Sequence, residues 1–174
     1  RHDVAAVTVG QRGDEASHPA RPDHEQSQAS GSHAGTARAG AGAGAGAALD
    51  DVVVCTSGGG LVAGTALAVR ARSPATRVWS AEPTGHDDHL RSLASGRRES
   101  NPPGTRSICD ALLSPQPGAM TFAINRPRLG PGLVVSDAEA AEAMRYAFAV
   151  LKLVVEPGGA VALAAVLAGR IETK

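Results

Sequence analysis

The sequence predicts an α/β fold with an open, mainly parallel sheet and flanking helices. Three short apolar runs, at 51–55, 76–81 and 133–135, have the continuous hydrophobicity of strands that are buried on both faces of a parallel sheet. Stretches rich in helix formers follow the first and third runs, at 61–72 and from Ser136 onward. Strand–helix alternation of this kind is typical of layered α/β domains.

The predicted elements differ in how clearly their ends are marked. The residues Ser136 to Glu139 form a capping box, in which serine and glutamate stand three positions apart at the start of a helix. The Glu-Pro-Gly-Gly run at 156–159 is expected to end that helical region, and 160–168 is predicted to be a buried helix of small residues. Between 82 and 131 the signals are weak, so we expect mostly loop with two short helices.

Composition divides the chain near residue 48. Residues 1–48 contain three large apolar residues, all valines before position 10, whereas the four aromatic residues all lie later. Such a segment buries too little apolar surface to offset its chain entropy. We therefore expect 1–48 to be a disordered or loosely attached segment, or a stretch read out of frame, and 49–174 to be the folded domain.

Charge, apolar length and cysteine content exclude several classes of protein. The 174 residues carry 17 Lys+Arg and 17 Asp+Glu, for a formal net charge of +0, which does not favour a nucleic-acid partner or a polybasic membrane surface. The longest apolar stretch, 160–168, is too short to span a membrane. Cys55 and Cys109 have no nearby cysteine partner, so we expect buried thiols in a reducing, cytoplasmic compartment.

A glycine-rich loop joins the first predicted strand to the helix after it, with the sequence Thr-Ser-Gly-Gly-Gly at 56–60. Successive N–H groups at a helix start, backed by the helix dipole, form an anion site that suits a phosphate. A tight turn without a ligand is the alternative. A second alternative is a dinucleotide-binding module that uses Gly58, Gly60, Gly64 and Glu82, although the spacing of these glycines departs from GxGxxG.

Five short motifs follow one another along the chain: Gly-Gly-Gly-Leu-Val-Ala-Gly at 58–64, Ala-Glu-Pro at 81–83, Ser-Ile-Cys-Asp at 107–110, Val-Ser-Asp at 135–137 and Val-Glu-Pro-Gly-Gly-Ala-Val at 155–161. The succession resembles the C-terminal half of threonine/serine dehydratases and serine racemases, which are fold-type II enzymes of the tryptophan synthase β-like superfamily dependent on pyridoxal 5′-phosphate (PLP). The resemblance implies a partial fold-type II domain and β-elimination of L-threonine or L-serine to a 2-oxo acid and ammonia. It also implies a small amino-acid substrate and a homo-oligomer.

The resemblance assigns roles to individual residues. It implies that main-chain N–H groups of the glycine loop bind the PLP phosphate, and that Glu156 lies near the cofactor ring and the substrate. A helix-terminating Glu-Pro is the alternative for Glu156. The implied phosphate-binding residues are Ser57, Gly58, Gly59, Gly60 and Leu61.

The resemblance also implies a divalent-metal site. Its ligands would be the Glu82 carboxylate, the main-chain carbonyl of His86 and the Asp88 carboxylate, a set that suits Mg²⁺ or Ca²⁺. The alternative is a solvated acidic loop formed by Glu82, Asp87 and Asp88.

The chain has two lysines, Lys152 and Lys174, and neither matches the family's Schiff-base position. PLP enzymes use that amine both to attach the cofactor and to move the substrate proton. We therefore predict a truncated dehydratase without a catalytic residue of its own, inactive alone. The rival interpretations are a non-catalytic remnant that binds a phosphate or a partner, and the dinucleotide-binding module.

Overall fold

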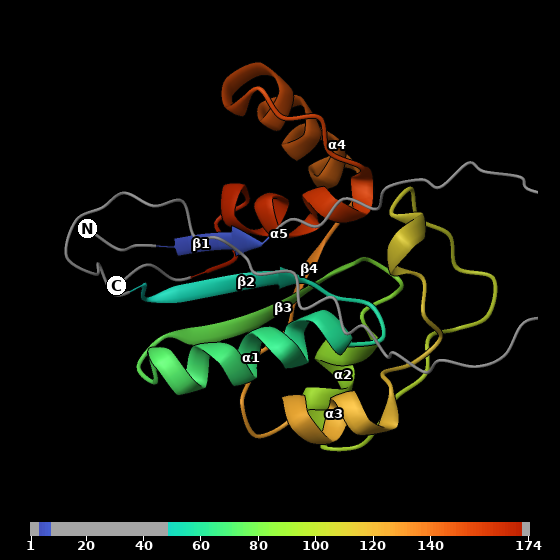
Figure 1. Ribbon diagram of the computed structural model, residues 1–174. Helices are drawn as coiled ribbons and strands as arrows, with labels where there is room; N and C mark the ends of the chain where they lie inside the picture. Colours follow the sequence, from blue (N-terminus) through green and yellow to red (C-terminus); the bar gives the residue numbers. More distant parts are fainter. Residues whose placement is uncertain (1–3, 8–48, 172–174) are drawn as a thin grey trace, which may run out of the picture.

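A four-stranded parallel sheet forms the centre of the computed structural model, which describes residues 4–7 and 49–171 (Figure 1). The strand order is β1-β2-β3-β4, and every neighbouring pair is parallel. The predicted α/β class with a parallel sheet is therefore confirmed. The strands are β1 (Val4–Val7), β2 (Asp51–Cys55), β3 (Arg77–Pro83) and β4 (Leu133–Val135).

Helices cover both faces of this sheet (Figure 1). On one face lie α1 (Gly60–Arg72), α2 (Asp88–Ser95) and α3 (Ala119–Asn125). On the other lie α4 (Asp137–Tyr146), a π-helical turn η2 (Ala147–Leu151) and α5 (Pro157–Leu167). A short 3₁₀ turn, η1 (Asp110–Leu112), lies in the long connection between α2 and α3. Within the described part of the chain, no helix is both long enough and apolar enough to cross a membrane.

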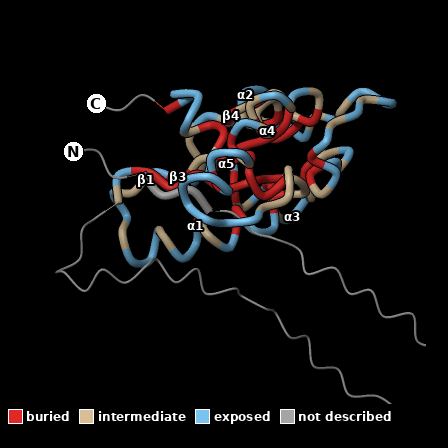
Figure 2. Tube along the Cα trace, turned by 90° about the horizontal axis from the view of Figure 1, so that it is seen from above, coloured by how far each residue is buried: buried red, intermediate tan, exposed pale blue. Residues whose placement is uncertain are grey.

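Strand β2 contributes to a hydrophobic core on each side of the sheet. Val53 and Cys55 pack into the core beneath α4 and α5, whereas Val52 and Val54 pack with α1. All four side chains are buried, which explains why this strand is a continuous apolar run. Figure 2 shows that buried residues run along the strands and the helices next to them.

The core beneath α4 and α5 is built mainly from small side chains. Alanines of α4 and α5 are fully or almost fully buried there, so the helices can approach the sheet and each other closely. The predicted capping box at the start of α4 is present: Ser136 Oγ accepts from the Glu139 N–H at 3.2 Å, and Glu139 Oε2 accepts from the Ser136 N–H at 2.7 Å.

Two elements differ from the sequence prediction. Strand β1 pairs with β2 although it lies in the segment 1–48, which we expected to be disordered, loosely attached or read out of frame. Its four residues are too few to show a periodicity of their own, and their pairing depends on the open edge of β2. Residues 8–48, with the Ala-Gly alternation, lie outside the described residues.

The second difference is the start of α5. This helix begins at Pro157 and not after the Gly-Gly pair, with Glu156 as its N-cap residue. Proline at the first helical position needs no hydrogen-bond donor, so Glu-Pro begins a helix here instead of ending one. Gly158 lies inside the first turn, where an added Cβ would come within 3.3 Å of Ala111 and Leu112. The glycine therefore permits close packing against η1.

Candidate phosphate-binding site

The glycine loop between β2 and α1 has a conformation that requires glycine at one position. Gly59 has φ +89°, in the left-handed region. A Cβ atom there would lie 2.5 Å from Cε1 of His89 and 2.9 Å from Nδ2 of Asn125. The loop passes directly over these two side chains. Both the backbone angle and these contacts therefore exclude a larger residue at position 59.

The carbonyl groups of the loop are held by the protein. The Gly58 carbonyl accepts from the Gly118 N–H at 3.0 Å and from Thr121 Oγ1 at 2.6 Å. The Gly59 carbonyl accepts from Asn125 Nδ2 at 3.2 Å. Because these carbonyls face α3, and the N–H of a trans peptide points opposite to its carbonyl, the N–H groups that follow them point to the other side of the loop. Among the described residues, no protein acceptor receives a hydrogen bond from the N–H groups of residues 57–61.

A cavity of about 230 Å³ lies beside the loop. It is formed by the end of β2, the start of α1, η1 and the start of α5. With the free N–H groups and the positive end of α1 on one wall, the cavity favours an anion. Its lining includes Cys55, Ser57, Gly58, Gly59, Gly60, Leu61, Ala111, Leu112, Glu156 and Gly158.

The structure therefore brings the sequence-predicted phosphate ligands and Glu156 to one cavity. Glu156 is the N-cap residue of α5, but its side chain makes no cap hydrogen bond. The Cys55 thiol donates to the Gly159 carbonyl at 3.3 Å and accepts from the Ala162 N–H at 3.3 Å. Burial raises the pKa of Cys55 to about 11, so this thiol stays protonated beside the cavity. Both cysteines are free and buried, as predicted.

Two residues that support the loop were missed by the sequence analysis. His89 and Asn125 are fully buried behind Gly59, with Asn125 Nδ2 3.1 Å from His89 Nε2. Burial lowers the pKa of His89 to about 4, so the ring is neutral and its Nε2 can accept from the amide. Both residues lie on short helices of weak pattern, and nothing in their local sequence indicates that they face inward.

The predicted acidic metal ligands are buried, which contradicts the alternative of a solvated acidic loop for two of its three members. Glu82 and Asp88 have 0% and 1% exposure. Ligand atoms of Glu82, Asp88 and His89 lie within 4.8 Å of one another. His86 is also buried, in the turn after β3, where its N–H donates to the Pro83 carbonyl at 3.0 Å.

The two carboxylates differ in their surroundings. Both oxygens of Glu82 accept main-chain N–H groups at the start of α2, from His89 and Leu90, each at 2.8 Å. Burial nevertheless raises the pKa of Glu82 to about 8, and it also raises the pKa of Asp88. Asp88 Oδ1 accepts from Asn101 at 2.6 Å, whereas Oδ2 is buried without a partner among the described residues.

This geometry argues against the dinucleotide alternative. A dinucleotide-binding glutamate must present its carboxylate to a ribose hydroxyl. Glu82 is fully buried and both its oxygens already accept hydrogen bonds from α2, so it is not placed for that role.

No lysine lines the cavity in the described part of the chain. Lys152 directly follows η2, and its Nζ donates to the Ala149 carbonyl at 2.8 Å. Lys174 lies outside the described residues.

Comparison with known proteins identifies the family. A model of the family "Pyridoxal-phosphate dependent enzyme" matches residues 16–174. Serine racemase of Oryza sativa subsp. indica is 40% identical over 119 residues, which cover 68% of this chain and 34% of that protein. L-threo-3-hydroxyaspartate ammonia-lyase of a Pseudomonas species is 41% identical over 118 residues, covering 67% and 36%.

Solved structures agree with these relatives. The threonine deaminase of T.th. matches with a TM-score of 0.67 and 42% identity, over 71% of this chain and 42% of that one. Maize serine racemase matches with a TM-score of 0.65 and 40% identity, over 68% and 36%. The chain belongs to the family of pyridoxal-phosphate dependent enzymes, and its fold is that of the fold-type II members. It spans about a third of the length of the curated relatives named above.

The conformation of the loop leads to a prediction about folding. Gly59→Ala should lower the free energy of unfolding by about 1–3 kcal/mol, because it forces a side chain into a left-handed position against His89. Gly60→Ala is the matched control, since a Cβ there meets nothing within 4 Å. Urea unfolding of both variants measures the difference. Equal losses in the two variants would contradict the conformational requirement at Gly59.

Proposed function

We propose that this chain binds pyridoxal 5′-phosphate by its phosphate, as the phosphate-binding part of a threonine/serine dehydratase. The observation that carries the proposal is the row of unpaired N–H groups at residues 57–61, at the positive end of α1 and facing a cavity. These donors fit a phosphate dianion, which needs several hydrogen bonds and a positive potential. Membership of the family of pyridoxal-phosphate dependent enzymes supports the phosphate of PLP as the anion.

The cofactor and the chain contribute different parts of the chemistry. When bound, PLP supplies an electron sink for bond breaking at the α-carbon of an amino acid. The loop N–H groups would hold the phosphate, and Glu156, on the cavity wall, would lie toward the ring and the substrate. Cys55 lines the same cavity as a neutral thiol and adds no charge there.

The proposed overall reaction of the dehydratase is β-elimination of L-threonine or L-serine to a 2-oxo acid and ammonia. The similarity to a threonine deaminase and to an L-threo-3-hydroxyaspartate ammonia-lyase supports this substrate class. The similarity to serine racemase supports serine as a substrate. The described cavity offers no lysine amine to accept the α-proton. We therefore propose that the chain holds the cofactor without catalysing the elimination on its own.

A second candidate function, a remnant that binds a partner, is supported by an exposed apolar arm. The end of α4, η2 and the segment after it carry large apolar side chains that face solvent, with Phe148 66% and Val154 89% exposed. Exposed apolar surface of this extent is typical of an interface. The same arm supports the homo-oligomer implied by the resemblance. The two free, buried thiols support a reducing, cytoplasmic location.

We further propose that Mg²⁺ or Ca²⁺ binds to Glu82, the His86 carbonyl and Asp88. The support is the buried Asp88 Oδ2, an oxygen without a partner among the described residues, close to the carboxylate of Glu82. A hard cation suits such oxygen ligands and would favour the ionised form of both carboxylates.

Phosphate binding can be tested with pyridoxine 5′-phosphate, which has no aldehyde and cannot react with Lys152 or Lys174. Calorimetric titration should give saturable binding that requires the phosphate, so that pyridoxine binds much more weakly. Gly60→Asp should weaken binding about tenfold or more, because a carboxylate at the start of α1 repels the phosphate while remaining compatible with the helix.

Gly64→Asp is the matched control for this titration. It adds the same charge to the same helix, at an exposed position that does not line the cavity and where a Cβ meets nothing within 4 Å. Its affinity should equal that of the parent chain. Unchanged binding in Gly60→Asp, or equal binding of pyridoxine, would contradict the proposed site.

Metal binding can be tested by thermal unfolding. Millimolar Ca²⁺ or Mg²⁺ should raise the Tm of the chain above its value in EDTA, since a ligand of the folded state stabilises it. Asp88→Asn should remove this increment, whereas the control Asp87→Asn, which changes a less buried neighbouring carboxylate, should keep it. A metal-independent Tm, or an equal loss in both variants, would contradict the metal proposal.

A further inference from the structure

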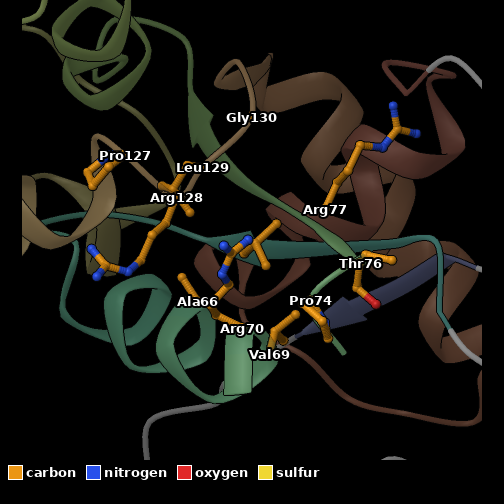
Figure 3. A pocket seen from close by; sticks show the side chains of 12 residues that line it. Ala66, Val69, Arg70, Pro74, Thr76, Arg77, Pro127, Arg128, Leu129 and Gly130 are labelled. Atoms are coloured by element: carbon orange, nitrogen blue, oxygen red, sulfur yellow. The ribbon is translucent and has the colours of Figure 1, made fainter. Parts of the chain in front are cut away.

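A second cavity lies at the opposite end of α1 from the glycine loop, with a volume of about 400 Å³ (Figure 3). Its walls come from the last turns of α1, the turn that leads into β3, the first residues of β3, and the segment after α3. The volume is within the range of small-molecule sites in proteins. None of the residues assigned to phosphate, ring or metal binding lines it.

The floor of this cavity is apolar. Ala66 and Val69 of α1, Val78 of β3 and Leu129 of the segment after α3 form it. Ala66 and Val78 belong to the hydrophobic core on this face of the sheet, and Val69 and Leu129 pack against that core. A ligand with an apolar body would continue that core outward.

The cationic lining is the feature that selects the ligand's charge. Arg70, Arg77 and Arg128 line the cavity, and no acidic residue does so among the described residues. Arg77 is already paired: its Nε lies 2.8 Å from Asp51 Oδ1, and its guanidinium stacks 5.3 Å from the centre of the Trp79 ring. Figure 3 shows the Arg77 guanidinium directed away from the other two arginines.

Arg70 and Arg128 keep donors that no protein group uses. Arg70 makes no hydrogen bond or ion pair within the described part of the chain. Arg128 uses one nitrogen, Nη1, which donates to the Ile124 carbonyl at 2.7 Å. Both side chains are exposed and come from different elements, α1 and the segment after α3 (Figure 3). Two such guanidinium groups are suited to carboxylate or phosphate oxygens.

The main chain around the cavity is held in place before any ligand binds. The Gly130 N–H donates to the Val78 carbonyl at 2.8 Å, which fixes the segment after α3 against β3. On the other side, Thr76 Oγ1 donates to the Leu49 carbonyl at 2.6 Å and pairs with Ser73 Oγ at 2.7 Å. A preformed cavity loses little conformational entropy when it binds a ligand.

We propose that this cavity binds a small amphipathic organic anion. The apolar body lies on Val69, Val78 and Leu129, and a carboxylate or phosphate group is bound by Arg70 and Arg128. The shared chemistry is an anionic head on an aliphatic body of a few carbons. The site is separate from the glycine loop, so its ligand could occupy the chain together with the phosphate of PLP.

The test is a titration of the ¹⁵N-labelled chain followed by NMR, with hexanoate, hexyl phosphate and hexanol as probes. We expect saturable shifts at Val69, Thr76 and Leu129 with one or both anions and not with hexanol. Which anion binds more tightly distinguishes a carboxylate site from a phosphate site. Shifts of the glycine loop report separately on phosphate binding there.

The variants Arg70→Gln and Arg128→Gln should each weaken anion binding about tenfold, the value of one charge-assisted hydrogen-bond pair. Arg72→Gln is the matched control, because Arg72 is exposed, belongs to the same last turn of α1 and does not line the cavity. Its affinity should be unchanged.

Three results would overturn the proposal. One is an equal loss of affinity in Arg72→Gln, which would mean that the anion responds only to the general charge of the helix end. Another is equal binding of hexanol, which would leave the arginines without a role. The third is the absence of saturable shifts at the cavity with either anion at millimolar concentrations.

Discussion

The close packing of Gly59 on His89 and Asn125 determines the geometry of the candidate site. The contact leaves no room for a side chain and keeps the loop in a left-handed turn. Asn125 also donates to the Gly59 carbonyl, so α2 and α3 together orient the loop from behind. The N–H groups on the other side are then left facing the cavity. The proposed anion site at the front of the loop therefore depends on this neutral, buried pair behind it.

Burial has opposite consequences for the two kinds of polar group around the loop. It lowers the pKa of His89 and so keeps the ring neutral, which suits a hydrogen-bonding support. It raises the pKa values of Glu82 and Asp88, which lie beside the same helix, α2. These carboxylates are therefore costly to ionise unless a cation is near. A cation bound beside them would offset this cost by stabilising the ionised carboxylates.

The sequence predicts what is locally encoded. The buried strand β2 is recognisable from its continuous valines, the start of α4 from its capping box, and the loop from three successive glycines. The motif succession extends this local information to Glu156, which the fold brings to the same cavity across the sheet.

What the sequence does not reveal depends on tertiary contacts. Strand β1 exists through its pairing with β2, and the early start of α5 depends on Gly158 packing against η1. His89 and Asn125 are polar residues on short helices, and only the packed structure places them inside. The arginine-lined cavity likewise brings Arg70 and Arg128 together from segments more than fifty positions apart.

A crystal structure of the chain grown with pyridoxine 5′-phosphate would show whether the glycine loop binds the phosphate. We expect the phosphate within hydrogen-bond distance of the N–H groups of residues 57–61, with the ring toward Glu156. A phosphate bound instead between Arg70 and Arg128, with the glycine loop vacant, would contradict this expectation.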